Sequence, residues 1–203
     1  MNAHTACTAS PGARADAQRD RILCAALKCF IEHGFHAASM ASIAQTADMS
    51  AGLMYRYFAN KNAIVLAIIE RQLEEKRCAI RQLHSSTDIA ARLVQTFEQW
   101  CARDSQKMSA ALFLEMSAEA TRNPQIAEAL RTSDSLTRAE FQNWLSRSRS
   151  EGGLGLPDET AASRALLLQF MFEGLALRAA RGPDLDRDQL RATLNDLFAR
   201  LMP

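Results

Sequence analysis

The sequence SMASIAQTADMSAGLMYRYFANK, residues 39–61, decides the fold. Its first half predicts a short helix, because Ser39 is a good N-cap and the apolar residues after it recur at helical spacing. After a three-residue break, its second half predicts another short helix, from a cap at Ser50 to about Tyr57. A longer helix then begins at Lys61. Two short helices joined by a tight break are typical of a helix-turn-helix unit, whose second helix enters the DNA major groove.

A longer supporting helix is predicted just before this unit, from about residue 16 to residue 33. Two adjacent rows of apolar residues give it one buried stripe: Ile22, Ala26 and Phe30, and Leu23, Leu27 and Ile31. Gly34 is expected to stop it. A bland three-helix core would show the same periodicity, so periodicity alone does not establish DNA binding.

Helical periodicity also dominates the rest of the chain, and no alternating strand pattern competes with it. After the helix of residues 61–83, we expect helices at about residues 88–103, 106–121, 124–150, 158–181 and 186–201. The predicted fold is all-α with about nine helices. Its predicted parts are a flexible tail at 1–15, a helix-turn-helix domain at 16–66 and a helical ligand-binding and dimerisation domain at 67–203.

Composition bounds the function only loosely. The 203 residues carry a formal net charge of +1, with +2 in residues 1–61 (six basic minus four acidic) and −1 in the remainder. This asymmetry has the sign expected for an N-terminal DNA-binding part, but it is weak. The five cysteines and four histidines form no zinc pattern. No apolar run is long enough for a signal peptide or a membrane span, so we expect a cytoplasmic protein. No cofactor or metal is expected.

The second short helix carries the residue types that a DNA phosphate needs. Ser50 and the free backbone N–H groups at the helix start suit a phosphate oxygen. Gly52 allows close approach to another surface, and Tyr55 and Tyr57 offer hydroxyl groups. Lys61 stands in the first turn of the next helix, where a cation opposes the helix dipole unless an anion docks beside it.

Residues 22–66 resemble the DNA-binding domain of TetR-family regulators. The matching pieces are Ile22-Leu23-x-Ala25-Ala26, Phe30, Gly34, Ser39-Met40-x-x-Ile43-Ala44, Ala47, Ser50-x-Gly52-x-x-Tyr55-x-Tyr57-Phe58 and Lys61. The layout of about nine helices also resembles that family. The resemblance implies a homodimer that binds a double-stranded DNA operator. Most members of the family are repressors, which are released from DNA when a small molecule binds the C-terminal domain.

The resemblance also assigns roles to single residues. Contacts with phosphates are implied for Ser39, Ser50, Tyr55, Tyr57 and Lys61, with Gly52 between them; positions at or near base edges are implied for Ala51, Leu53 and Arg56. The alternative for each is a solvent-facing or packing residue. Arg14, Arg19 and Arg21 form either an arm near the DNA or a solvated helix face.

Three positions depart from the family pattern. Asp48 stands where glycine is frequent, and aspartate tolerates the left-handed backbone that such a turn needs. Ala51 stands where a polar residue is frequent, which removes one hydrogen bond and leaves room for a thymine methyl group. Asn62 stands where glutamate is frequent. Phosphate anchoring is therefore better supported than base readout.

The predicted helix at 158–181 is apolar on nearly every side, so it must be buried on two sides. We expect one side to face the core and the other to pair, together with the last helix, with the same surface of a second subunit. The segments from Phe113 to Pro124 and from Glu173 to Arg178 resemble the subgroup of betaine-pathway repressors, which supports the subgroup's fold and not its ligand.

A hydrophobic ligand pocket with a few polar groups is the second prediction for this region. Its candidate residues are Phe97, Trp100, Met108, Phe113, Glu115, Met116, Trp144, Phe170 and Glu173. The alternative is an ordinary core with solvent-facing glutamates. The sequence shows no catalytic residues: the glycines at 152–155 lie between helices and not after a strand, so an enzyme is not expected. An activator or a DNA-bound regulator without a ligand remains open.

Overall fold

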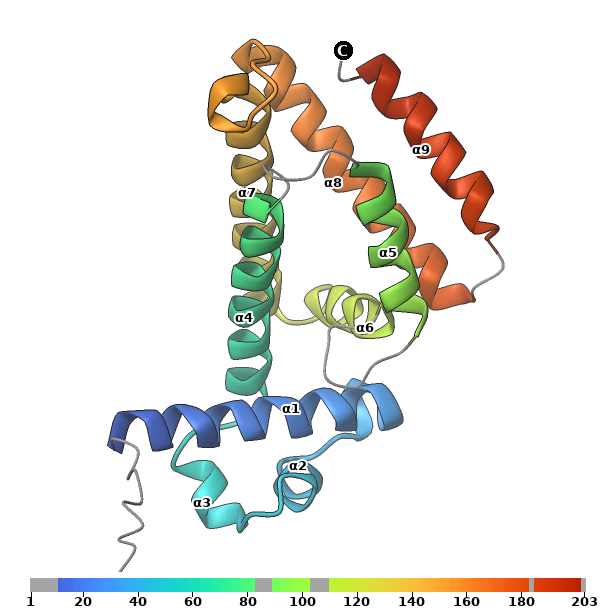
Figure 1. The fold of residues 1–203 in the computed structure, drawn as a ribbon. Helices are drawn as coiled ribbons and strands as arrows, with labels where there is room; N and C mark the ends of the chain where they lie inside the picture. Colours follow the sequence, from blue (N-terminus) through green and yellow to red (C-terminus); the bar gives the residue numbers. More distant parts are fainter. Residues whose placement is uncertain (1–10, 83–88, 103–109, 183–184, 202–203) are drawn as a thin grey trace, which may run out of the picture. The chain divides into compact units, whose positions relative to one another are not determined.

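The computed structural model describes residues 11–82, 89–102, 110–182 and 185–201. These ranges contain nine α-helices, one short 3-10 helix and no strand, which confirms the all-α prediction. The elements are α1 (Pro11–Ala37), α2 (Met40–Thr46), α3 (Ala51–Tyr55), α4 (Lys61–Gln82), α5 (Ile89–Cys101), α6 (Ala110–Ala120), α7 (Pro124–Ser146), η2 (Arg149–Glu151), α8 (Asp158–Arg181) and α9 (Arg187–Leu201) (Figure 1). The chain divides into an N-terminal unit, residues 1–64, and a C-terminal unit, residues 65–203.

Helix α1 begins earlier than the sequence pattern predicted. Residues 11–15 were expected in the flexible tail, but they form its first turn, while residues 1–10 lie outside the described residues. Proline is well suited to a first helical turn, and the alanines that follow Pro11 are strong helix formers. Gly34 breaks the helix as expected, with φ 78° and ψ 162°, and a final turn then runs to Ala37.

Helices α2 and α3 lie on the same side of α1 and form the helix-turn-helix (Figure 1). Ser39 caps α2 through a capping box with Ser42. Asp48 takes the left-handed conformation in the turn, with φ 49°, as its side chain predicted. Met54 is fully buried, so α3 is anchored to the core of this unit by its only buried residue.

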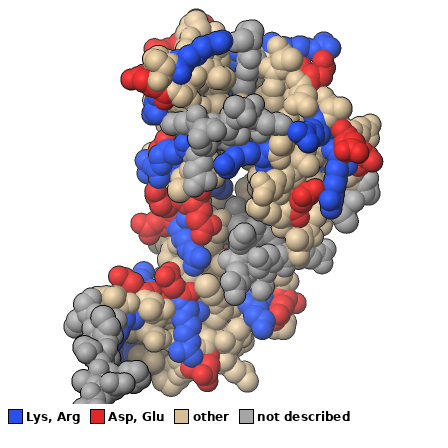
Figure 2. Space-filling model, viewed as in Figure 1, with Lys and Arg blue, Asp and Glu red and all other residues tan. Residues whose placement is uncertain are grey.

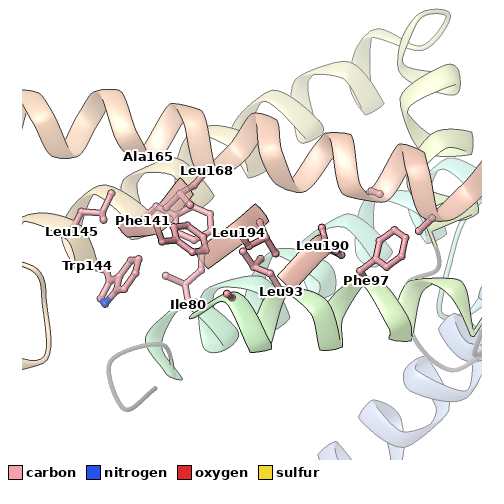
Figure 3. Packing of buried hydrophobic residues seen from close by; sticks show 14 of the residues in the cluster. Ile80, Leu93, Phe97, Phe141, Trp144, Leu145, Ala165, Leu168, Leu190 and Leu194 are labelled. Atoms are coloured by element: carbon pink, nitrogen blue, oxygen red, sulfur yellow. The ribbon is translucent and has the colours of Figure 1, made fainter. Parts of the chain in front are cut away.

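The C-terminal unit is built around one apolar cluster (Figure 3). Helix α8 packs on α5, α6 and α7, and α9 packs on α5. The close-up shows Trp144 and Phe141 of α7 beside Ile80 of α4. An ion pair joins α4 to α7, because Arg77 Nε donates to Glu140 Oε1 at 2.7 Å. None of the described helices is long and apolar enough to cross a lipid bilayer.

Helix α7 ends four residues before the predicted boundary at Ser150. Arg147 leaves the helical region, with ψ 145°, and the chain turns through η2. The Gly153 N–H then donates to the Ser148 carbonyl at 2.9 Å. A Cβ atom at Gly153 would collide with the Arg147 carbonyl, so this close return requires glycine. The sequence pattern missed the end because the polar residues after Ser146 continue a helical composition.

Candidate DNA-binding face and ligand cavity

Helix α3 turns Met54 inward and presents most of its other residues to solvent. Ala51, Gly52, Tyr55 and Arg56 are exposed, while Leu53 and Tyr57 are half-buried. The structure therefore leaves most of the predicted DNA-contacting residues of this segment open to solvent, and we call the surface of residues 50–57 the α3 face. Tyr55 is 54% exposed, unusually open for a large aromatic side chain. Its hydroxyl group is available to a partner outside the chain.

Both predicted serine caps are formed. Ser50 Oγ accepts a hydrogen bond from the Leu53 N–H at 3.2 Å, and Ser39 Oγ accepts one from the Ser42 N–H at 3.1 Å. A serine hydroxyl that accepts a cap bond retains its own proton as a donor. Ser39 directs this proton to Ser42 Oγ at 3.2 Å, whereas Ser50 can hold its helix start and offer its proton to a phosphate oxygen.

Gly52 has no packing reason to be glycine within the described protein. A Cβ atom built there would meet no atom within 4 Å, and its backbone needs no positive φ. The residue leaves the α3 surface flat at its centre. That flatness suits the close approach of an external surface.

Lys61, for which the family resemblance implies a phosphate contact, also has acceptors within the protein. Its ammonium donates to the carbonyl oxygens of Phe35 at 2.7 Å and Ala38 at 3.0 Å. It also lies 4.3 Å from the centroid of the Phe35 ring. The carbonyls at the end of α1 thus compensate a cation at the start of α4, the task that the sequence argument gave to a DNA phosphate.

Arg19 and Arg21 also reach backbone carbonyls of the helix-turn-helix. Arg19 donates to the Tyr57 carbonyl at 3.3 Å and lies 4.6 Å from the Phe58 ring centroid. Arg21 donates to the Asp48 carbonyl at 2.8 Å and to its carboxylate at 3.3 Å. Neither residue is merely a solvated helix face. No local sequence pattern predicts these contacts, because they join positions 27 and 38 residues apart.

Charge is mixed on the surface. On the face in view in Figure 2, Lys and Arg side chains are interspersed with Asp and Glu among the described residues. This agrees with the net charge of only +1. DNA binding by such a surface depends on where single donors lie and not on one broad basic field.

The C-terminal unit contains a cavity of about 540 Å³ with aromatic walls. Five of its lining residues are aromatic: Trp100, Phe113, Phe141, Trp144 and Phe172. Phe172 packs edge-on against Trp100, with ring centroids 6.3 Å apart, and stacks on Phe141 at 5.6 Å. The volume falls within the range of small-molecule pockets, whose walls combine apolar surface with polar groups that orient the ligand.

One end of the cavity is polar. Lys76, Asp134 and Glu173 line it and also line a smaller adjoining cavity of about 150 Å³. Burial lowers the pKa of Lys76, although the nearby Asp134 and Glu173 charges oppose this shift. Burial raises the pKa of Asp134 against the attraction of Lys76. Gln169 Nε2 donates to Glu173 Oε1 at 3.1 Å, which orients that carboxylate.

Only some of the predicted ligand residues line a cavity. Trp100, Phe113, Trp144 and Glu173 line the larger cavity, and Met116 lines the smaller one. Phe97 is buried in the apolar cluster, and Glu115 is half-buried outside both linings. Phe170 is 57% exposed on α8, so it lies on the surface and not in a cavity. Met108 lies outside the described residues.

Sequence reasoning missed the polar residues that α4 contributes to the cavity. Gln72 and Lys76 interrupt a row that Ile64, Ile68 and Ile80 continue at a spacing of four residues. Polar residues within such a row must be buried with the apolar ones. That interruption was the signal that could have located this wall.

Two family profiles match the chain. The profile described as "Bacterial regulatory proteins, tetR family" matches residues 22–68, and that of the "BetI-type transcriptional repressor, C-terminal" matches residues 89–203. The chain belongs to the TetR family of transcriptional regulators. It is thus a helix-turn-helix transcriptional regulator and not an enzyme.

Among TetR-family relatives, the HTH-type transcriptional regulator UidR of Escherichia coli K12 is 36% identical over 164 residues, which cover 78% of this chain and 80% of UidR. The solved structure of Salmonella enterica GusR superposes with a TM-score of 0.67 at 30% identity, covering 92% of this chain and 95% of GusR. A Saccharomonospora viridis regulator in complex with choline shares the fold, with a TM-score of 0.69 at 23% identity, covering 91% of this chain and 96% of that one.

Proposed function

We propose that this regulator is a cytoplasmic, homodimeric repressor that leaves its operator when a small molecule binds the 540 Å³ cavity. The observation that carries the proposal is that one helix, α4, contributes residues to two regions. This single helix supplies Lys61 to the helix-turn-helix and Gln72, Lys76 and Ile80 to the cavity wall. A ligand that displaces the wall acts on the same helix that begins in the DNA-binding unit.

A second subunit is supported by one face of α8. Leu167, Phe170 and Leu177 are 41%, 57% and 37% exposed, at spacings of three and seven residues that place them in one stripe. Gly174 lies in the same stripe, where a Cβ atom would meet nothing within 4 Å. An apolar stripe interrupted by a small residue suits close packing against its own symmetry copy. Two subunits would present two α3 faces to a two-fold DNA site.

The oligomeric state tests this part of the proposal. Phe170→Glu places a charge at the centre of the stripe, so we expect a monomer by sedimentation and a loss of operator affinity of more than a hundredfold. Leu136→Glu is the matched control, because Leu136 is 41% exposed on a different helix, α7. A dimer that tolerates Phe170→Glu, or dissociates equally in both variants, would contradict the α8 interface.

Ligand release is tested by titrating small molecules into a preformed complex with the chain's own upstream DNA. Choline, the ligand of the Saccharomonospora viridis regulator, is one defined probe, beside a panel of aromatic and polar metabolites. A true effector must bind the DNA-free protein more tightly than the complex, by the factor by which it weakens DNA binding. Trp100→Ala should abolish the release without changing DNA affinity. A ligand that tightens the complex would indicate a corepressed or activating regulator instead.

A further inference from the structure

The three junctions of the helix-turn-helix are each closed by one cation. Lys61 holds two carbonyls at the α1–α2 junction, Phe35 and Ala38. Arg21 holds the Asp48 carbonyl in the α2–α3 turn. Arg19 holds the Tyr57 carbonyl, just after α3.

Each contact falls where the backbone needs it. Carbonyls at the end of a helix lack partners within that helix and carry its negative dipole end, so a cation is favoured there. Gly34 interrupts α1 just before the carbonyls that Lys61 holds. Among the described residues, Asp48 is the one non-glycine residue with a positive φ. Arg21 therefore clamps the most strained residue of the turn.

We propose that Arg19, Arg21 and Lys61 are positioning residues, which act on DNA recognition by fixing the angle of α3 and not by contacting phosphates. Their hydrogen bonds are charge-assisted, and such bonds are shorter and stronger than neutral ones. Two of the three cations also lie over an aromatic ring, Arg19 on Phe58 and Lys61 on Phe35. Each of these two cations is thus held by hydrogen bonding to a carbonyl and by contact with an aromatic ring.

If these three cations hold the backbone, few cations of the N-terminal unit remain for contact with DNA. Residues 1–61 carry six cations, Arg14, Arg19, Arg21, Lys28, Arg56 and Lys61. Three close the junctions, and Lys28 lies 4.0 Å from Glu32 in an i,i+4 pair. Arg14 and Arg56 are left as the cations of this segment for direct contact with DNA, beside the hydroxyl and N–H donors of the α3 face.

Salt dependence and sequence specificity distinguish the two roles. A lost phosphate contact weakens binding to all sequences and lowers the slope of log K against log salt by about 0.9. A misplaced reading helix instead loses contacts that only the correct sequence makes. The inference rests on DNA binding by the α3 face, so the wild-type protein must first select a preferred fragment from a randomised DNA pool. If it selects none, the premise itself is refuted.

The experiment measures binding of Arg19→Ala, Arg21→Ala and Lys61→Met to the selected fragment and to a scrambled fragment at several KCl concentrations. We expect about a tenfold loss on the selected fragment, no more than a twofold change on the scrambled one, and an unchanged slope. Arg21→Lys and Lys61→Arg, which keep a charged donor, should restore most of the affinity. Arg56→Ala is the contrasting variant and should lower the slope, and Lys28→Ala should behave like wild type.

Two results would overturn the inference: equal losses on both fragments with a lower slope, or no loss on either. Circular dichroism establishes that each variant is folded before binding is measured. If Lys61→Met does not fold, Lys61→Gln replaces it, because the amide still donates a hydrogen bond without the charge.

Discussion

The two units use their charged side chains in different ways. In the N-terminal unit, Arg19, Arg21 and Lys61 bind backbone carbonyls that lie 23 to 38 residues away. In the C-terminal unit, arginines pair with carboxylates, as Arg77 does with Glu140 at 2.7 Å and Arg187 with Glu98 at 3.1 Å. Carbonyl contacts fix the path of the chain, whereas pairs between flexible side chains tolerate movement. The difference fits a helix-turn-helix of fixed shape and a C-terminal unit whose side-chain pairs can rearrange.

Because each unit has its own core, we expect a core truncation in one unit to affect the function of that unit alone. Met54 and Leu145 are both fully buried, one in each unit, and truncation of either to alanine should cost about 2–5 kcal/mol of stability. Met54→Ala should also lower operator affinity more than tenfold, because Met54 anchors α3, while folded Leu145→Ala should bind DNA like wild type. Urea unfolding and filter binding measure both quantities. Equal DNA defects would show that the units do not act separately.

We expect a buried ion pair to contribute more to the stability of the protein than an exposed one. The Glu140 side chain is 17% exposed and accepts a 2.7 Å bond from Arg77, so Glu140→Gln should cost about 1–2 kcal/mol of stability. Asp48→Asn removes the carboxylate of a pair that is open to solvent, and asparagine also accepts a positive φ. We expect no measurable change in its urea midpoint. A loss at Asp48 as large as that at Glu140 would reverse the comparison.

Tyr55→Phe isolates one donor of the α3 face. Removal of the hydroxyl should weaken operator binding by about fivefold, which corresponds to one hydrogen bond of about 1 kcal/mol. The thermal midpoint should not change, because Tyr55 is half exposed. Gel-shift titration provides the affinity, and an affinity equal to that of wild type would exclude a role for this hydroxyl group.

The smallest effect concerns Asp134 and pH. Its pKa is raised in the folded protein, chiefly by burial, so the folded state holds this proton more tightly than the unfolded state. As pH rises from the unfolded pKa through the folded pKa, wild type loses stability from this group. Asp134→Asn cannot lose it, so the variant should gain stability relative to wild type as the pH rises above the ordinary pKa of an aspartate. Urea midpoints at fixed protein concentration test this, and a constant difference would contradict it.

The helix-turn-helix could be predicted in detail because its signals are local. Ser39, Ser50 and Asp48 act on backbone within three residues of themselves, so their caps and turn follow from the sequence. The positions of Lys61 and Phe170 could not be predicted in the same way. Lys61 finds carbonyls 23 and 26 residues away, and Phe170 lies on a helix that is apolar on several sides. Periodicity identifies such a helix as buried, but only packing decides which side stays open.

The tyrosines and tryptophans of the chain are divided between its two units. The sequence contains two tyrosines, Tyr55 and Tyr57, both on the α3 face, and two tryptophans, Trp100 and Trp144, both on the cavity wall. Under the proposed function, emission from the indole rings should report occupancy of the cavity, and the phenol rings should report contact with DNA. The unlabelled protein would then carry its own two-channel optical assay, in which effector entry and operator engagement can be followed separately and ordered in time.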